Sequence, residues 1–91
     1  MPDNYTPSQT DVAWTRSTLR MIAIGGAWMF PAAALVFTRS GERELTFTSR
    51  CDVPHEMPLQ ESDETAGEFQ DRMIERVRKN VEAIGWKMVT P

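Results

Sequence analysis

The sequence predicts an α+β fold, in which a small and mainly antiparallel sheet is covered by two helices. The prediction rests on an amphipathic pattern over residues 65–84, a period-two alternation on both sides of residue 40, and a shorter alternation near the C-terminus. The expected order is helix, β-hairpin, long loop, amphipathic helix and terminal strand. With 91 residues, the chain has the length of one α+β domain (residues 11–91) behind a flexible N-terminal arm (residues 1–10).

The first helix is expected from Ser8 to Ile24. Ser8 or Thr10 is a suitable N-cap, and Asp11 in the first turn suits the positive end of the helix dipole. Gly25-Gly26 is expected to end the helix, because glycine readily adopts the positive φ found at many helix C-termini. One face of this helix carries Val12, Thr15, Leu19, Ile22 and Ala23.

A β-hairpin is expected after the glycines. A short apolar strand begins at Ala27, and Pro31 should lie at a strand start, a bulge or an edge because it has no N–H. Residues 34–38 are expected to form a buried strand, and residues 39–42 the turn. In the returning strand, Leu45 and Phe47 should face the core.

The second helix is the strongest local prediction. Thr65 and Glu68 have the spacing of a capping box, and Gly85 is a natural stop. Trp86 and Met88 should lie on the core side of a terminal strand that returns to the hairpin. The apolar stripe of the helix is Ala66, Phe69, Met73, Val77, Val81 and Ile84, and its expected outer pairs are Glu68 with Arg72, Glu75 with Lys79, and Arg78 with Glu82.

Composition argues against several classes of function. The net charge of −3 disfavours direct binding to nucleic acid. The single cysteine, Cys51, lies four residues before His55, but a catalytic thiol also needs an orienting group and an oxyanion site, which nothing else in the chain supplies. Cys51, Asp52, His55 and Glu56 do not resemble a closed metal framework either. We therefore expect no enzyme activity, no catalytic residues, no metal and no cofactor.

The membrane is a weaker alternative. Residues 21–38 carry no charge and lie between Arg20 and Arg39, so a continuous helix there could nearly cross a bilayer. Gly25-Gly26 and Pro31 interrupt such a helix. Because residues 1–11 lack a basic or apolar run, no secretory signal is evident and a cytoplasmic location is expected.

Charge is concentrated in one part of the chain. Between Asp52 and Asp71 there are seven acidic residues and no lysine or arginine. We call residues 51–64 the acidic loop, and we expect it to meet a basic surface on a partner protein, with apolar anchors between the charges. The alternative is a solvated loop followed by the acids that a helix N-terminus favours. The candidate contacts are Asp52, Val53, Glu56, Met57, Leu59, Glu61, Asp63 and Glu64.

A second candidate surface lies on the first helix. Trp14 falls off the predicted core face, near Met21, so the two residues define a possible contact for a homo-oligomer. In the other interpretation, Trp14 closes over the edge of the sheet. A self-assembling structural subunit is therefore an alternative function.

Several fold-forming segments carry a resemblance: Gly25-Gly26, Trp28-x-x-Pro31, the run Phe37-Thr38-Arg39-Ser40-Gly41 leading to Leu45, and Ile84-Gly85-Trp86. They resemble small uncharacterised accessory proteins of bacteriophages that infect actinobacteria, over residues 11–89. Ala32-Ala33-Ala34 replaces a glycine-bearing turn expected there. The resemblance implies an accessory phage or prophage product, many of which bind a host protein. Together with the acidic loop, it leads us to expect a module that binds and modulates a host protein.

Overall fold

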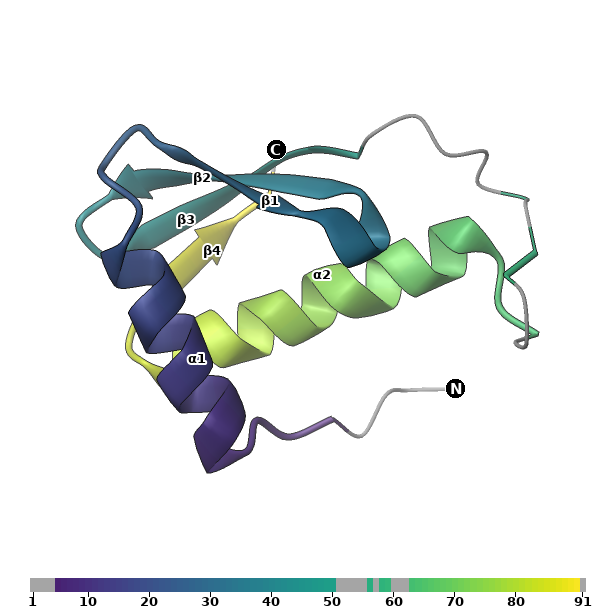
Figure 1. The fold of residues 1–91 in the computed structure, drawn as a ribbon, viewed down its shortest axis with the longest axis horizontal. Coiled ribbons are helices and arrows are strands. Elements are labelled where there is room, and N and C mark those ends of the chain that lie inside the picture. Colours follow the sequence, from purple (N-terminus) through teal and green to yellow (C-terminus); the bar gives the residue numbers. More distant parts are fainter. Residues whose placement is uncertain (1–4, 51–55, 57, 60–62, 91) are drawn as a thin grey trace.

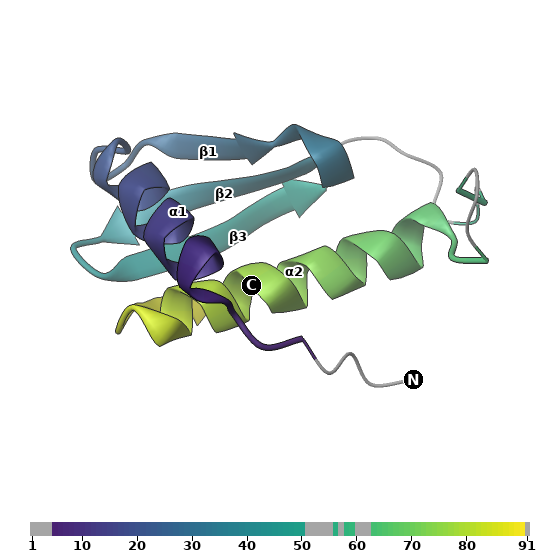
Figure 2. The same ribbon diagram turned by 60° about the horizontal axis from the view of Figure 1, so that its bottom comes forward.

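The computed structural model describes residues 5–50, 56, 58–59 and 63–90. One sheet has the strand order β1-β2-β3-β4, antiparallel except for the parallel β3–β4 pair. Both helices lie on the same side of this sheet (Figures 1 and 2), which confirms the predicted α+β class. The elements are α1 (Gln9–Arg20), β1 (Ala27–Phe30), the 3-10 helix η1 (Pro31–Ala33), β2 (Leu35–Gly41), β3 (Glu44–Arg50), α2 (Ala66–Ala83) and β4 (Lys87–Val89).

The core lies between the sheet and the two helices. Phe37 is completely buried at its centre, and its ring lies 5.4 Å from that of Trp28 and 5.7 Å from that of Phe47. The predicted inward positions of β3 are confirmed, because Leu45 is buried and Phe47 packs against the core. The buried apolar cluster consists of Leu19, Ala33, Leu35, Phe37, Leu45, Val77 and Val81.

Helix α1 begins as predicted but ends earlier. Ser8 and Asp11 form a reciprocal capping box, and the donation of hydrogen bonds by Ser8 lowers the pKa of the Asp11 carboxyl. The helix stops at Arg20, so the predicted end at Ile24 is wrong. The last turn is closed by backbone hydrogen bonds from Met21 to Thr18 and from Ile22 to Leu19, and the carbonyls of Leu19 and Ile22 also accept hydrogen bonds from the Arg39 guanidinium.

Arg39 also explains why the predicted turn at residues 39–42 is wrong. Its backbone N–H and carbonyl pair with Gly26 and Gly25, at 2.9 and 2.7 Å, and its Cα partner across the hairpin is Leu45. Arg39 is therefore part of the sheet. Strand β2 continues to Gly41 and β3 begins at Glu44, so the tight turn is shifted to residues 42–43.

Strands β1 and β2 are joined through η1 and a left-handed residue. Pro31 occupies the first turn of η1, where a missing N–H is tolerated. Ala34 follows with φ 55° and ψ 47°, a conformation that glycine adopts without cost and an L-residue does not. Alanine therefore occupies a left-handed position in the connection between β1 and β2.

Replacing Ala34 with glycine is expected to stabilise the protein. Relief of the left-handed strain, about 1–2 kcal/mol, should exceed the added flexibility of the unfolded chain, about 0.5–1 kcal/mol. The net gain should be about 0.5 kcal/mol, measured as a higher urea midpoint. Ala32→Gly, in the same 3-10 helix but with negative φ, is the control and should be destabilising. Equal loss of stability in both variants would show that position 34 is unstrained.

Helix α2 matches its prediction closely. Thr65 and Glu68 form the predicted capping box, and after the C-cap Ile84 the chain leaves the helix through Gly85 at φ +81°. The outer charge pairs differ in part from those predicted. Arg78 pairs with Glu82 as expected and also with Glu75, which lowers the pKa of the Glu75 carboxyl.

The described part of the N-terminal segment contacts helix α2. Helix α1 starts at Gln9, inside the residues expected to form the arm. The Tyr5 hydroxyl donates a 2.6 Å hydrogen bond to Asn80 Oδ1, and the Arg76 guanidinium lies over the Tyr5 ring. Burial raises the pKa of Tyr5. These contacts bring residue 5 to the C-terminal half of α2.

Residues 21–38, the candidate membrane span, do not form one helix. They contain β1, η1 and most of β2, connected by turns. In the part of the chain that the structure describes, no helix is both long and apolar enough to cross a bilayer. Residues 21–38 therefore do not form the continuous helix that a membrane anchor at this position would require.

Candidate functional site

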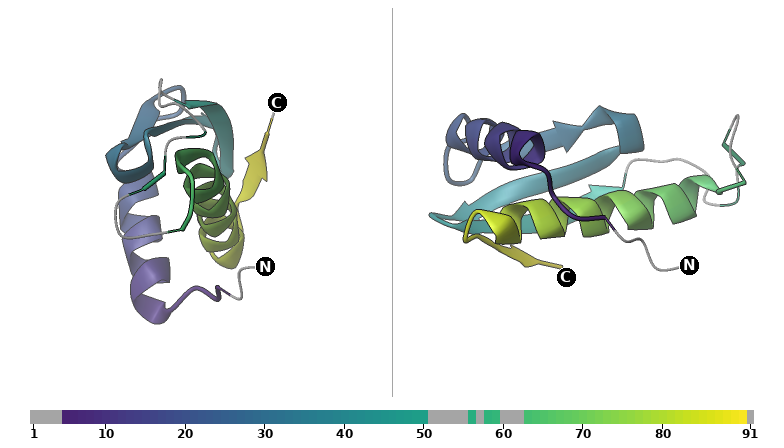
Figure 3. Two further views of the ribbon diagram at one scale, coloured as in Figure 1. Left: turned by 90° about the vertical axis from the view of Figure 1, so that its right-hand side faces the viewer. Right: turned by 90° about the horizontal axis from the view of Figure 1, so that it is seen from below.

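The acidic loop is only partly covered by the described residues. Asp52, Val53, Met57 and Glu61 lie outside them. Glu56 and Asp63 are exposed, whereas Leu59 and Glu64 are half-buried. The Leu59 N–H donates a 3.0 Å hydrogen bond to the Glu64 carbonyl, and Pro58 forms a β-bridge with Thr65. The two described stretches of the loop are therefore held side by side, before the start of α2 (Figure 3, left).

Several carboxylates of this region are engaged within the chain. Glu64 accepts two hydrogen bonds from Arg72, at 2.6 and 2.9 Å, in a paired arrangement typical of guanidinium and carboxylate. The Glu68 carboxylate accepts from the Thr65 N–H, and Asp71 pairs with Arg50. The exposed negative charge among the described loop residues is therefore concentrated at Glu56 and Asp63.

An apolar pocket of about 190 Å³ includes Leu59 and Ala66, which each lie three positions along the chain from one of these acids, and sequence patterns did not predict it. Its two sides come from η1 and from the first turns of α2. Only Leu59 among its lining residues had been expected to contact a partner. The apolar pocket is lined by Pro31, Ala32, Ala33, Ala34, Leu59, Ala66, Phe69 and Gln70.

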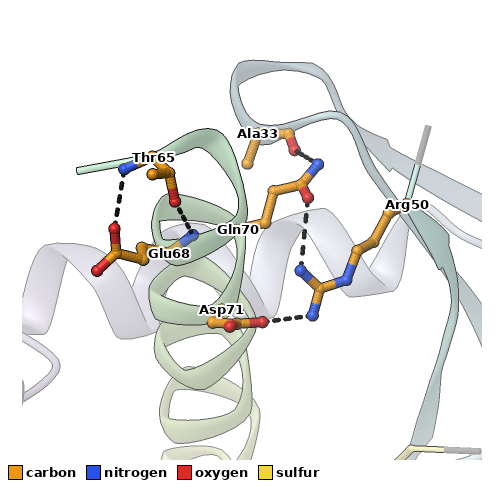
Figure 4. Close-up of polar contacts among 6 residues, drawn as sticks. All are labelled: Ala33, Arg50, Thr65, Glu68, Gln70 and Asp71. Carbon is orange, nitrogen blue, oxygen red and sulfur yellow. Dashed lines mark hydrogen bonds and ion pairs between the residues drawn. The ribbon is translucent and has the colours of Figure 1, made fainter. Parts of the chain in front are cut away.

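A buried polar side chain fixes the shape of the apolar pocket. Gln70 is 2% exposed, and its amide donates a 2.9 Å hydrogen bond to the Ala33 carbonyl (Figure 4). The Gln70 carbonyl faces Arg50, whose guanidinium also binds Asp71 (Figure 4). This network connects α2 to η1 on one side and to the end of β3 on the other. These hydrogen bonds fix the position of the Gln70 side chain in the wall of the apolar pocket.

The second candidate surface consists of Trp14 and Met21, both of which are exposed. The Trp14 ring lies 5.7 Å from that of Trp28 on β1, so Trp14 packs against the outermost strand of the sheet. Trp14 is still 48% exposed, and Met21 is 87% exposed just beyond the end of α1. Met29, on β1, is 62% exposed. These apolar side chains border the unpaired edge of β1.

The chemistry considered for Cys51, Asp52 and His55 concerns residues outside the described part of the chain. Within residues 5–50, 56, 58–59 and 63–90, no group of three or more histidine, cysteine, aspartate or glutamate side chains could hold a metal ion.

Comparison with protein-family models, with curated proteins and with solved structures finds no match for this chain. The functional argument therefore rests on its own residues.

Proposed function

We propose that this protein is a binding module that takes a basic segment of a partner protein at the N-terminal end of α2. The observation that supports it is the apolar pocket, two of whose lining residues, Leu59 and Ala66, each lie three positions along the chain from an exposed acid, Glu56 and Asp63 respectively. An apolar side chain of the partner enters the pocket, and lysine or arginine residues on either side face the acids. The protein acts by occupying a partner surface, without catalysis.

The apolar pocket suits one aliphatic or methionine side chain. A volume of about 190 Å³ accommodates such a group, and its burial contributes about 1.5–3 kcal/mol. This places the main affinity in a single anchor, as in protein interfaces where a few residues dominate. The network through Gln70 keeps the pocket open, so little ordering cost is paid on binding.

The exposed acids supply orientation and speed of association. Charges at the rim of an interface mainly raise the association rate and select against acidic partners. Their effect falls with salt, because the Debye length shortens from about 10 Å at 0.1 M to about 3 Å at 1 M. The proposed complex should therefore form more slowly at high salt while its dissociation rate changes little.

The proposed partner is a host protein, in keeping with the resemblance to phage accessory proteins, and the proposed location is the host cytoplasm. A second candidate function is a self-assembling subunit. The exposed Trp14, Met21 and Met29 side chains near the unpaired edge of β1 favour it, because sheet edges readily pair with another chain. The mass in solution separates the two: a partner-binding module is a monomer alone, whereas a subunit forms a defined oligomer.

The test is capture of a partner from an actinobacterial host lysate, followed by binding measurements with the purified partner. Ala32→Leu fills the apolar pocket from an exposed position on η1, and should weaken binding about tenfold or more. Ala83→Leu adds the same side chain at the exposed end of α2 and should bind as the wild type does.

The charge contribution is tested separately. Glu56→Gln with Asp63→Asn should lower the association rate several-fold, whereas Glu44→Gln with Glu82→Gln, which makes the same change in net charge elsewhere, should not. Binding that is equally strong in the Ala32→Leu variant and independent of Glu56 and Asp63 would overturn the proposed function.

A further inference from the structure

A second cavity, of about 300 Å³, is lined by residues of the C-terminal half of α1, the β2–β3 turn and the chain beyond α2, and we call it the arginine cleft. These three parts of the chain lie on the left in Figure 1. The start of α2 lies on the right in Figure 1. The cleft is lined by Arg16, Arg20, Arg39, Glu42, Arg43, Ile84 and Trp86.

Arg39 forms the fixed wall of the cleft. Its guanidinium donates hydrogen bonds to the carbonyls of Ile22 at 2.7 Å, Glu42 at 3.1 Å, Gly41 at 3.3 Å and Leu19 at 3.4 Å. It also lies 5.0 Å from the centre of the Trp86 ring. These contacts hold the end of α1 and the β2–β3 turn at a set separation, and they place a positive charge at the cleft.

The other three arginines are unpaired. Within the part of the chain that the structure describes, the side chains of Arg16, Arg20 and Arg43 form no hydrogen bond or ion pair, and all three residues are exposed. This is unusual in a chain with thirteen acidic and ten basic residues. Elsewhere, Arg50 and Arg78 each bind a carboxylate of α2. Four guanidinium groups against the single carboxylate of Glu42 leave a strong local positive charge in a chain of net charge −3.

We propose that the arginine cleft binds a compact phosphate-bearing anion, of the size of pyrophosphate or of the phosphates of a nucleotide. Guanidinium groups bind phosphate oxygens through paired, charge-assisted hydrogen bonds. A single carboxylate is satisfied by one guanidinium, whereas a phosphate group presents oxygens in several directions. Arginines that approach from a helix and from a turn therefore suit a multiply charged, roughly spherical anion.

The same charges argue against a long nucleic acid. Apart from the charged residues that line the cleft, the chain has twelve acidic and six basic residues, so the phosphates of a strand that extends beyond the cleft would meet a net negative charge. A small anion stays inside the cleft and experiences mainly the arginines. The site is also separate from the apolar pocket, so it does not depend on the proposed partner function.

The experiment is calorimetric titration of the full chain with sodium pyrophosphate at low salt. We expect saturable binding at one site. Arg16→Gln, Arg20→Gln and Arg43→Gln should each weaken it about tenfold, because each removes a charge-assisted hydrogen bond to the anion. Arg78→Gln removes the same charge from the exposed face of α2 and should leave the affinity unchanged. Unchanged thermal midpoints confirm that the variants are folded.

Two further titrations distinguish the possible sources of phosphate. ATP should bind with the same dependence on the three arginines. A single-stranded DNA of twelve nucleotides should bind no more tightly than pyrophosphate does. Absence of pyrophosphate binding, or equal weakening by Arg78→Gln, would overturn the proposal. DNA binding that depends on these arginines without pyrophosphate binding would also overturn it, and would assign the cleft to nucleic acid.

Discussion

Replacing Phe37 with alanine is expected to lower the free energy of unfolding by about 4 kcal/mol. Phe37 has no exposed surface, and its ring packs between those of Trp28 and Phe47, so the substitution removes apolar contacts and leaves a cavity. Domains of this length are stable by only about 5–14 kcal/mol. The variant should therefore lose a large part of its stability, which urea denaturation followed by circular dichroism measures directly.

Met29→Ala is the matched control for Phe37→Ala. Met29 lies in the strand that pairs with β2 but is 62% exposed, so its truncation should cost well under about 1 kcal/mol. If Phe37→Ala cost no more than Met29→Ala, the core could not be centred between the sheet and the two helices as described.

The second large effect is expected at Gln70. Gln70→Met keeps the size of the side chain but removes its amide nitrogen and oxygen. Without the amide, the buried Ala33 carbonyl loses its 2.9 Å hydrogen bond. It also removes the Gln70 oxygen that Arg50 contacts. A buried polar group left unsatisfied costs about 1–3 kcal/mol, so a total loss of about 2–3 kcal/mol is expected in the same urea experiment.

Gln9→Met tests whether the loss at Gln70 comes from burial. Gln9 is exposed in the first turn of α1, so this change should alter the free energy of unfolding by less than about 0.5 kcal/mol. A neutral or stabilising result for Gln70→Met would contradict the role of the network, because it would mean that the Ala33 carbonyl finds another partner.

The elements that the sequence predicted well are those determined by nearby residues. The start of α1 depends on Ser8 and Asp11, and the start of α2 on Thr65 and Glu68, each pair three residues apart. The period-two pattern around Leu45 likewise identified the inward face of β3. Local capping and periodicity were enough to predict the fold class and the order of the elements.

The sequence predictions were wrong or incomplete where the structure depends on contacts between residues far apart in the sequence. Helix α1 ends at Arg20, and Arg39, about twenty positions along the chain, donates hydrogen bonds to the carbonyls of Leu19 and Ile22 at that end. The same residue extends β2 and shifts the turn. Gln70 belongs to no apolar pattern, yet it is buried, and its amide donates a hydrogen bond to the Ala33 carbonyl. Ala33 lies thirty-seven residues away in the sequence, so a local pattern does not reveal this contact. No local pattern contains these contacts.

The candidate sites also differ in whether nearby or distant residues form them. The acidic loop was visible in the sequence because its acidic residues lie within a short stretch that contains no lysine or arginine. The apolar pocket was not, because it combines η1, Leu59 and the start of α2, which come together only in the fold. The arginine cleft brings together residues from position 16 to position 86. Its one sequence signal is the excess of arginine over acid between residues 16 and 43, where four arginines accompany one glutamate.

Backbone amide chemical shifts, recorded with and without the purified partner, test the central claim most directly. Binding at the N-terminal end of α2 predicts that the largest changes occur at Ala32, Ala33, Leu59, Ala66 and Phe69, while the amides of the arginine cleft stay unchanged. Changes concentrated at Trp14, Met21 and Met29 would contradict the account and assign the partner contact to the edge of β1.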